Sequence, residues 1–243
     1  TEKGGKDKPN LTKPVGIQFN DLTVVYDNEP VLSGLNLDIQ SGTFVALVGA
    51  SGAGKTTLVD VLLGLVKTEE GAVEIDGIPL NELDLSHWRH SIGYMSQRVP
   101  VITGSIRDNI RFGRDYIDES AIEEAVEQAS LNDFISNRSE GLGTLISAGG
   151  NEISGGELQR MGLARALAGK PKLLILDEVS SALDVESERA VMEEIKRFKG
   201  KMTIIAIAHR LSTIRHADTI HVMAGGEIKE SGSWEELISQ NGT

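Results

Sequence analysis

The 243-residue chain contains no cysteine, which excludes disulfide bonds and cysteine-based metal sites and is typical of cytosolic proteins. It has no apolar run approaching the roughly 18 to 20 residues that a membrane-crossing helix needs, and its N-terminus lacks the apolar core of a signal peptide. Basic residues are fewer than acidic ones: the chain has 24 Lys and Arg and 36 Asp and Glu, which gives a net charge of −12. Because nucleic acids select basic surfaces, this balance argues against a nucleic-acid partner. The net charge does not exclude nucleotide binding, because a phosphate-binding loop is a local electrostatic feature.

The hydrophobic content of 40% allows a full core, built as one large domain or two lobes. Residues 1–14 are rich in Lys, Gly and Pro and show no apolar periodicity, so we expect a linker or tail there. Because the first residue is Thr rather than Met, we interpret the chain as a piece of a longer polypeptide. We expect residues 15–243 to form the folded domain.

The apolar pattern predicts an α/β fold with a mostly parallel sheet, an antiparallel β subdomain and a helical subdomain. Polar and apolar residues alternate in segments that predict half-exposed strands: 17–25, 35–39 and 72–77. More uniformly apolar runs predict buried parallel strands: 44–48, 173–176, 202–208 and 219–222. Helical patterns occur at 55–65, 154–168 and 185–198, and a last strand and helix are predicted at 228–231 and 234–239. Residues 105–138 contain helix-like segments without a convincing strand, so we expect the helical subdomain to span roughly 98–168.

The most informative segment is residues 49–57, which read Gly-Ala-Ser-Gly-Ala-Gly-Lys-Thr-Thr and directly follow an apolar run. They match the P-loop pattern, in which a glycine, four free positions and Gly-Lys-Ser/Thr join a buried strand to a helix. Glycines let the backbone N–H groups turn inward, and the following helix adds its positive N-terminal end. Lys55 can then reach the terminal phosphates, and Thr56 can ligate Mg²⁺. The residues expected to bind a nucleoside triphosphate here are Gly49, Ser51, Gly52, Gly54, Lys55, Thr56 and Thr57.

A second element of phosphate chemistry is the apolar strand 173–176, which is followed by Asp177 and Glu178. Adjacent strand residues point to opposite sides, so the two carboxylates have different roles if the strand geometry continues. Asp177 fits the Mg²⁺-associated acid of a P-loop enzyme. Glu178 fits the base that orients or deprotonates the attacking water. Alone, the two acids would be read as solvating a strand end, but beside a P-loop we interpret them as functional.

Residues 153–160 read Ile-Ser-Gly-Gly-Glu-Leu-Gln-Arg and precede the acidic strand. Together with the P-loop, they resemble the nucleotide-binding domain of an ATP-binding cassette (ABC) transporter, whose signature reads Leu-Ser-Gly-Gly-Gln. Ser154 can cap the following helix, and Gly155 and Gly156 allow close backbone approach to a phosphate. Glu157 replaces the family's Gln; it completes a capping box but brings a negative charge near an anionic ligand. We expect nucleotide binding to survive this change, at a cost in affinity for the γ-phosphate.

The resemblance covers residues 15–240 and implies roles for positions outside these motifs. Tyr26 resembles the aromatic residue that stacks on adenine, and Gln97 resembles the glutamine that contacts Mg²⁺ and the attacking water. The segment 181–184, Ser-Ala-Leu-Asp, resembles the loop that crosses the dimer interface and ends in Asp184. His209 resembles the histidine that contacts the γ-phosphate. Histidines that match no family element are expected to be structural: His87, His90, His216 and His221.

The family resemblance implies ATP and Mg²⁺ as cofactors, ATP hydrolysis as the activity, and a head-to-tail pair as the active form. ATP on one P-loop would be covered by Ser154–Gly156 of a second nucleotide-binding domain. Residues 103–110 resemble the exporter subgroup, in which this domain is fused behind a transmembrane domain at the cytoplasmic face of a membrane. Exporters commonly carry Thr-x-Val-Gly-Glu-Arg-Gly before the signature, whereas residues 144–150 have Ala148 in place of the Glu. The alternatives are an importer ATPase, a soluble ABC-type ATPase, and a silent regulatory domain that binds ATP without hydrolysing it.

Overall fold

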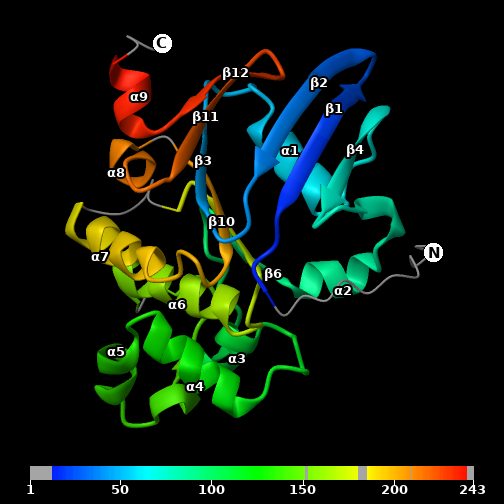
Figure 1. Cartoon of the computed structure of the whole chain (residues 1–243). Helices are drawn as coiled ribbons and strands as arrows, with labels where there is room; N and C mark the ends of the chain where they lie inside the picture. Colours follow the sequence, from blue (N-terminus) through cyan, green and yellow to red (C-terminus); the bar gives the residue numbers. More distant parts are fainter. Residues whose placement is uncertain (1–12, 151–152, 180–184, 209, 240–243) are drawn as a thin grey trace.

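A computed structural model describes residues 13–150, 153–179, 185–208 and 210–239 of the chain (Figure 1). Most of the predicted tail, the interface segment 181–184 with Asp184, and His209 lie outside the described residues. Within them, the predicted combination of a mostly parallel sheet, an antiparallel sheet and a helical part is confirmed.

The larger sheet of the described chain has six strands in the order β12-β11-β3-β10-β9-β6. Strands β11, β3, β10, β9 and β6 run parallel, and β12 joins β11 antiparallel. Their bounds are β3 Phe44–Val48, β6 Ile92–Met95, β9 Leu173–Asp177, β10 Thr203–Ile207, β11 Thr219–Ala224 and β12 Glu227–Gly232. Because the parallel strands share one direction, the turns after β3 and β9 emerge at the same edge of the sheet.

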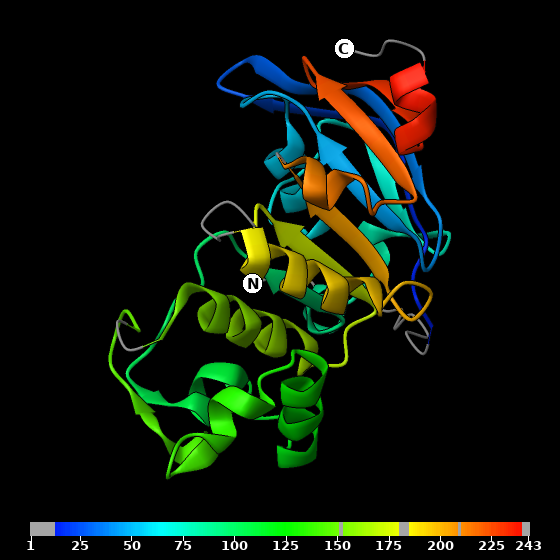
Figure 2. The ribbon, with the colours of Figure 1, turned by 90° about the vertical axis from the view of Figure 1, so that its left-hand side faces the viewer.

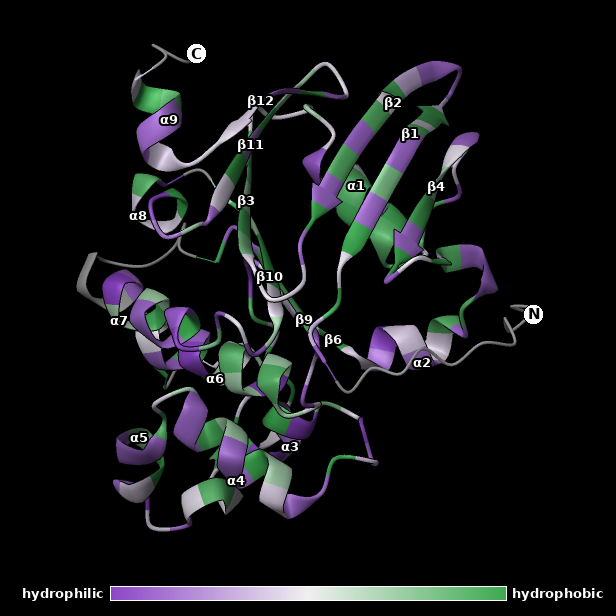
Figure 3. Ribbon diagram, in the orientation of Figure 1, coloured by the Kyte–Doolittle hydropathy of each residue, from purple (hydrophilic) through white to green (hydrophobic). Residues whose placement is uncertain are grey.

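An antiparallel sheet packs beside this core in the order β2-β1-β4-β5. Its strands are β1 Ile17–Tyr26, β2 Glu29–Ile39, β4 Glu70–Ile75 and β5 Ile78–Pro79. Helix α1 (Lys55–Leu62) shares one apolar core with residues of both sheets. Figure 3 shows the reason for the different sequence patterns: β1 and β2 alternate between hydrophobic and hydrophilic residues, whereas β3 is mainly hydrophobic.

The opposite face of the parallel sheet packs on helices. Since successive strand residues face opposite sides, β9 gives Leu173 and Ile175 to the core with α1, and Leu174 and Leu176 to a second core with the helical part. These helices are α3 Ile106–Arg111, α4 Glu119–Gln128, α5 Asn132–Ser136, α6 Gly155–Leu167 and α7 Val185–Lys196. Figure 2 shows the green helices α3 to α5 at one end of the molecule, with α6 and α7 closer to the sheet. A short strand pair, β7 Gly104–Ser105 with β8 Leu145–Ile146, lies in the same part.

The other short elements are η1 Leu80–Glu82, α2 Leu85–His90, η2 Gly141–Gly143, α8 Leu211–Ile214 and α9 Trp234–Ser239. Ser233 caps α9: its Oγ accepts from the backbone N of Glu236 at 3.3 Å. Among the helices that the structure describes, none combines the length and the apolar composition needed to cross a membrane.

His221 on β11 is a buried side chain, 6% exposed, whose Nδ1 lies 2.7 Å from Ser231 Oγ on β12. Burial lowers the pKa of His221 to about 4. Between pH 6.5 and 4 the unfolded chain therefore binds more protons at this residue than the folded protein does. The stability contributed by neutral His221 is complete above the unfolded pKa and is lost as the pH falls through this window.

We expect acid to destabilise the wild type more than a His221→Gln variant, by up to about 3 kcal/mol between neutral pH and the folded pKa. Urea unfolding of both proteins at a series of pH values measures this difference. Parallel curves of unfolding free energy against pH would show that His221 titrates alike in the folded and unfolded chains.

Candidate nucleotide site

The P-loop leaves β3 and enters α1 with three glycines in unusual conformations. Gly49, Gly52 and Gly54 have φ values of 152°, 81° and 100°. A Cβ on Gly54 would lie 2.6 Å from Leu32 Cδ2, and one on Gly49 would lie 2.2 Å from the carbonyl oxygen of Met223. Backbone conformation and close packing against a carbonyl oxygen therefore both require glycine at Gly49, and the left-handed conformation requires it at Gly54. At Gly52, where an added Cβ would meet nothing within 4 Å, only the conformation does.

A cavity of about 200 Å³ opens above this loop. Its lining consists of Val31, Ser51, Gly52, Ala53, Gly54, Lys55, Thr56, Thr57 and Glu178. The P-loop thus forms most of the wall, and the turn after β9 contributes a carboxylate. This is the carboxyl edge of the parallel strands, where open α/β sheets bind their ligands. Val31 of β2 was not predicted from the sequence, because nothing local marks the strand that passes over the P-loop.

Lys55 is the buried cation of the site, with 6% of its surface exposed. Its Nζ donates hydrogen bonds to the carbonyl oxygens of Gly49 at 2.8 Å and Ala50 at 3.0 Å. Burial lowers the pKa of Lys55, and the neighbouring carboxylates of Glu178 and Asp177 partly offset that shift. The amine therefore lies inside the loop, close to both acids.

Asp177 is the last residue of β9, and Tyr94 of β6 contacts it directly. The Tyr94 hydroxyl donates a hydrogen bond of 2.8 Å to Asp177 Oδ2. Asp60 on α1 is also near, since burial and then the charge of Asp177 raise its pKa. Asp60 follows Thr56 by four residues and so lies on the same side of the helix. Neither Tyr94 nor Asp60 was predicted. The spacing of four residues from Thr56 is a signal that could have identified Asp60, whereas finding Tyr94 required knowing that β6 pairs with β9.

Glu178 follows the end of β9 in a left-handed conformation, with φ 49°. Its backbone N–H donates to the carbonyl oxygen of Ile207 at the end of β10, at 3.0 Å. The chain therefore leaves strand geometry at this residue, and the two acids separate: Asp177 meets Tyr94, whereas Glu178 lines the P-loop cavity. Such a conformation is costly for a residue with a side chain and concentrates at functional sites.

The signature residues begin α6. Ser154 is its N-cap and forms the predicted capping box with Glu157. Glu157 Oε2 accepts from Ser154 N at 2.9 Å and from Ser154 Oγ at 2.6 Å, and Ser154 Oγ accepts from Glu157 N at 3.3 Å. None of the described residues 153–157 lines the cavity at the P-loop. Within the described chain, the signature and the P-loop cavity are therefore separate features.

The remaining predicted residues lie as follows. Tyr26 ends β1 and is 44% exposed. Gln97 follows β6 and is exposed; its carbonyl oxygen accepts from Gln159 Nε2 of α6 at 3.4 Å. Their roles toward a nucleotide stay predictions. Asp184 and His209 lie outside the described residues.

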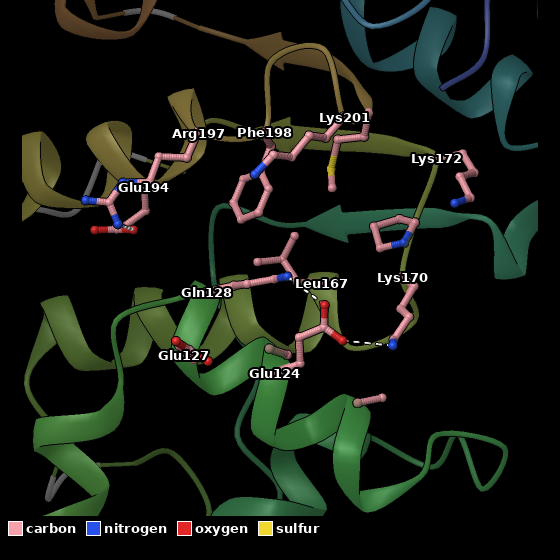
Figure 4. A pocket seen from close by; sticks show the side chains of 14 residues that line it. Glu124, Glu127, Gln128, Leu167, Lys170, Lys172, Glu194, Arg197, Phe198 and Lys201 are labelled. Atoms are coloured by element: carbon pink, nitrogen blue, oxygen red, sulfur yellow. Dashed lines mark hydrogen bonds and ion pairs between the residues drawn. The ribbon is translucent and has the colours of Figure 1, made fainter. Parts of the chain in front are cut away.

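A larger hollow of about 550 Å³ lies at the other end of β9 and β10, between α4 and the ends of α6 and α7 (Figure 4). Its lining contains two ion pairs: Lys170 with Glu124 at 2.8 Å and Arg197 with Glu194 at 2.6 Å. Phe198 on its wall is only 5% exposed.

Comparison with known proteins agrees with this geometry. The family model described as ABC transporter matches residues 32–181. The ATP-dependent lipid A-core flippase of Syntrophus aciditrophicus is 42% identical over 226 residues, which are 93% of this chain and 38% of the flippase. ABC transporter B family member 1 of Dictyostelium discoideum is 41% identical over 240 residues, which are 97% of this chain and 26% of that protein.

Among solved structures, a bacterial Atm1-family ABC exporter with ATP bound superposes with a TM-score of 0.87 at 33% identity, covering 98% of this chain and 42% of that one. The chain thus spans well under half the length of each of these relatives. With the P-loop, the acidic strand end and the capped signature helix in place, the chain belongs to the ABC transporter family, as a nucleotide-binding domain.

Proposed function

We propose that the chain binds ATP on the P-loop and hydrolyses it in a Mg²⁺-dependent reaction that drives export. The observation that carries the proposal is the cavity formed by residues 51–57 together with Glu178. It combines backbone N–H groups, the Lys55 amine and a carboxylate, which are the groups that phosphoryl transfer to water requires.

The oxygen donors beside the P-loop fit Mg²⁺. Thr56 carries an exposed hydroxyl on the first turn of α1, and Asp177 carries a carboxylate at the same sheet edge. Hard cations prefer such oxygen ligands, and the Gln97 side chain is the third proposed donor. Bound there, Mg²⁺ supplies positive charge against the phosphate oxygens.

The protein groups divide the remaining work. Lys55 and the P-loop N–H groups bind the phosphates, and Tyr26 stacks on adenine. Glu178 accepts a proton from the attacking water or orients it. His209 contacts the γ-phosphate.

The proposed active form is a head-to-tail pair. In each composite site, Ser154, Gly155 and Gly156 of one domain cover ATP held by the P-loop of the other, and Asp184 lies at the interface. The exposed Ser154 at the start of α6 and its absence from the P-loop cavity lining support this arrangement. Because ATP then contacts both domains, its binding favours the closed pair, and hydrolysis releases it.

The matched relatives are longer than this chain, which supports our proposal that it works with a transmembrane domain at the cytoplasmic face of a membrane. The names of the relatives, a flippase and an Atm1-family exporter, favour export over import. Ala148 stands where exporters commonly carry Glu, so we infer that contact with the membrane domain uses other residues of this segment. We also propose residues 15–243 as the domain, with roughly 98–168 as its helical subdomain.

A complementation experiment tests the composite site. Lys55→Ala disables the P-loop, and Gly155→Asp places a carboxylate at the signature, where the helix N-terminus tolerates it. Each variant alone is expected to hydrolyse ATP very slowly, because both of its sites contain one defective half. A mixture should recover activity, since mixed pairs contain one fully intact site.

Phosphate release, measured with and without Mg²⁺, provides the readout, and equal amounts of each variant alone provide the control. A mixture no more active than its components would contradict the head-to-tail site. A wild type that binds ATP but releases no phosphate would favour the silent regulatory domain instead.

A further inference from the structure

Asp177 interacts with a hydroxyl donor, a second carboxylate and an amine. Its carboxylate accepts a hydrogen bond from Tyr94 of β6, and its charge acts on Asp60 of α1 and on Lys55 of the P-loop. The direct contact is the 2.8 Å hydrogen bond that the Tyr94 hydroxyl donates to Asp177 Oδ2. Register explains the contact: Tyr94 pairs with Ile175 on the adjacent parallel strand, two residues before Asp177.

From this contact we infer that Tyr94 is a positioning residue for the metal site: its hydroxyl fixes the Asp177 carboxylate in the orientation that binds Mg²⁺. The inference rests on the proposed function, because it assigns the Mg²⁺ role to Asp177. The inference adds Tyr94, which would act on the metal through the Asp177 carboxylate rather than by contacting the nucleotide.

The need for such a contact follows from the neighbouring charges. Asp60 and Asp177 repel each other when both are ionised, and this repulsion favours turning Asp177 away from α1. Thr56, the proposed metal ligand, lies on that same side of α1. The hydroxyl that Tyr94 donates from the neighbouring strand β6 anchors one carboxylate oxygen and leaves the other oriented for a cation. Lys55 adds positive charge nearby but donates its hydrogen bonds to carbonyl oxygens of the P-loop.

The Tyr94 hydroxyl is suited to this role because a phenol is an uncharged O–H donor at neutral pH. The side chain as a whole is 38% exposed, so removal of its oxygen leaves no buried cavity.

The test is Tyr94→Phe, which keeps the ring and removes the hydrogen bond. Binding of Mn²⁺ to the ADP-bound protein, followed by electron paramagnetic resonance, reports on the metal site without turnover. Outer-shell partners of metal ligands typically change metal affinity 10- to 100-fold, so we expect Mn²⁺ binding to weaken about tenfold. ADP binding in the presence of EDTA should be unchanged, because the variant leaves the P-loop intact.

Tyr116→Phe is the matched control: it removes a tyrosine hydroxyl in the helical part, where Tyr116 contacts His90, and should leave Mn²⁺ binding unchanged. A second comparison uses Asp177→Asn, in whose background Tyr94→Phe should have little further effect. Mn²⁺ affinity equal to that of the wild type, or tighter, would overturn the inference.

These outcomes are separable from failure of the proposed function. If the wild type binds no nucleotide and hydrolyses no ATP, the proposed function is wrong. If it binds nucleotide, binds Mn²⁺ and hydrolyses ATP, but Tyr94→Phe leaves the metal affinity unaltered, only the role of Tyr94 is wrong.

Discussion

Glu178→Gln is expected to slow ATP hydrolysis by a factor of roughly 10² to 10⁴, the usual contribution of a positioned general base. The amide keeps the size and the hydrogen-bonding oxygen of the side chain but cannot accept a proton from water. ATP binding should persist, because Lys55 and the P-loop N–H groups are untouched. ATP should then hold the head-to-tail pair closed, since the step that opens it is blocked.

Phosphate release measures the rate of ATP hydrolysis. Size-exclusion chromatography in the presence of ATP and Mg²⁺ measures the fraction of the protein that forms the pair. Glu193→Gln provides a matched control. Glu193 is ion-paired with Lys196 on the surface of α7, so its substitution should leave both readouts unchanged. Hydrolysis at the wild-type rate in Glu178→Gln would show that Glu178 is not the base that acts on the attacking water. Slow hydrolysis without a trapped pair would instead weaken the link between hydrolysis and opening.

Lys55→Ala is expected to weaken ATP binding by roughly 10- to 150-fold, which corresponds to the 1.5–3 kcal/mol that hydrogen bonds to charged groups contribute. Lys55 is the cation at the centre of the P-loop, and its amine already lies within reach of the loop carbonyls. Without it, the phosphates meet Glu178 and Asp177 with less compensating charge. The affinity loss should be larger for ATP than for AMP, which lacks the terminal phosphates.

Isothermal titration with both nucleotides tests this expectation. Lys67→Ala is the control, because Lys67 is exposed and lies beyond the end of α1, outside the cavity lining. Equal losses for ATP and AMP would indicate that Lys55 supports the fold of the loop rather than the terminal phosphates.

Features that depend on short-range chemistry could be predicted from the sequence. The P-loop was one, because its glycines and Lys55 lie within nine residues and the backbone conformations they need are local. The Ser154–Glu157 capping box was another, since its partners are one helical turn apart. Strands β3 and β9 were found because burial on both faces makes them continuously apolar.

Other features depend on contacts that the local sequence does not contain. The β7–β8 pair has two residues in each strand, too few for any period to emerge. Tyr94 and Asp177 are separated by 83 residues, and they meet only because β6 takes the place next to β9 in the sheet. Val31 lines the P-loop cavity because the antiparallel sheet packs over the P-loop. No sequence motif predicts this packing.

The capping box at the start of α6 has a consequence for how firmly two domains can hold each other. A serine hydroxyl has a single proton, and that of Ser154 is already donated to Glu157 Oε2. To donate to a phosphate oxygen, the hydroxyl must first rotate away from the carboxylate, so one hydrogen bond is exchanged for another and the net gain is small. The family's glutamine offers a neutral amide at that position, whereas Glu157 competes as an anion for the same proton. In the proposed pair, the hydrogen bond from Ser154 to the nucleotide would therefore be gained by exchange rather than added as a new bond.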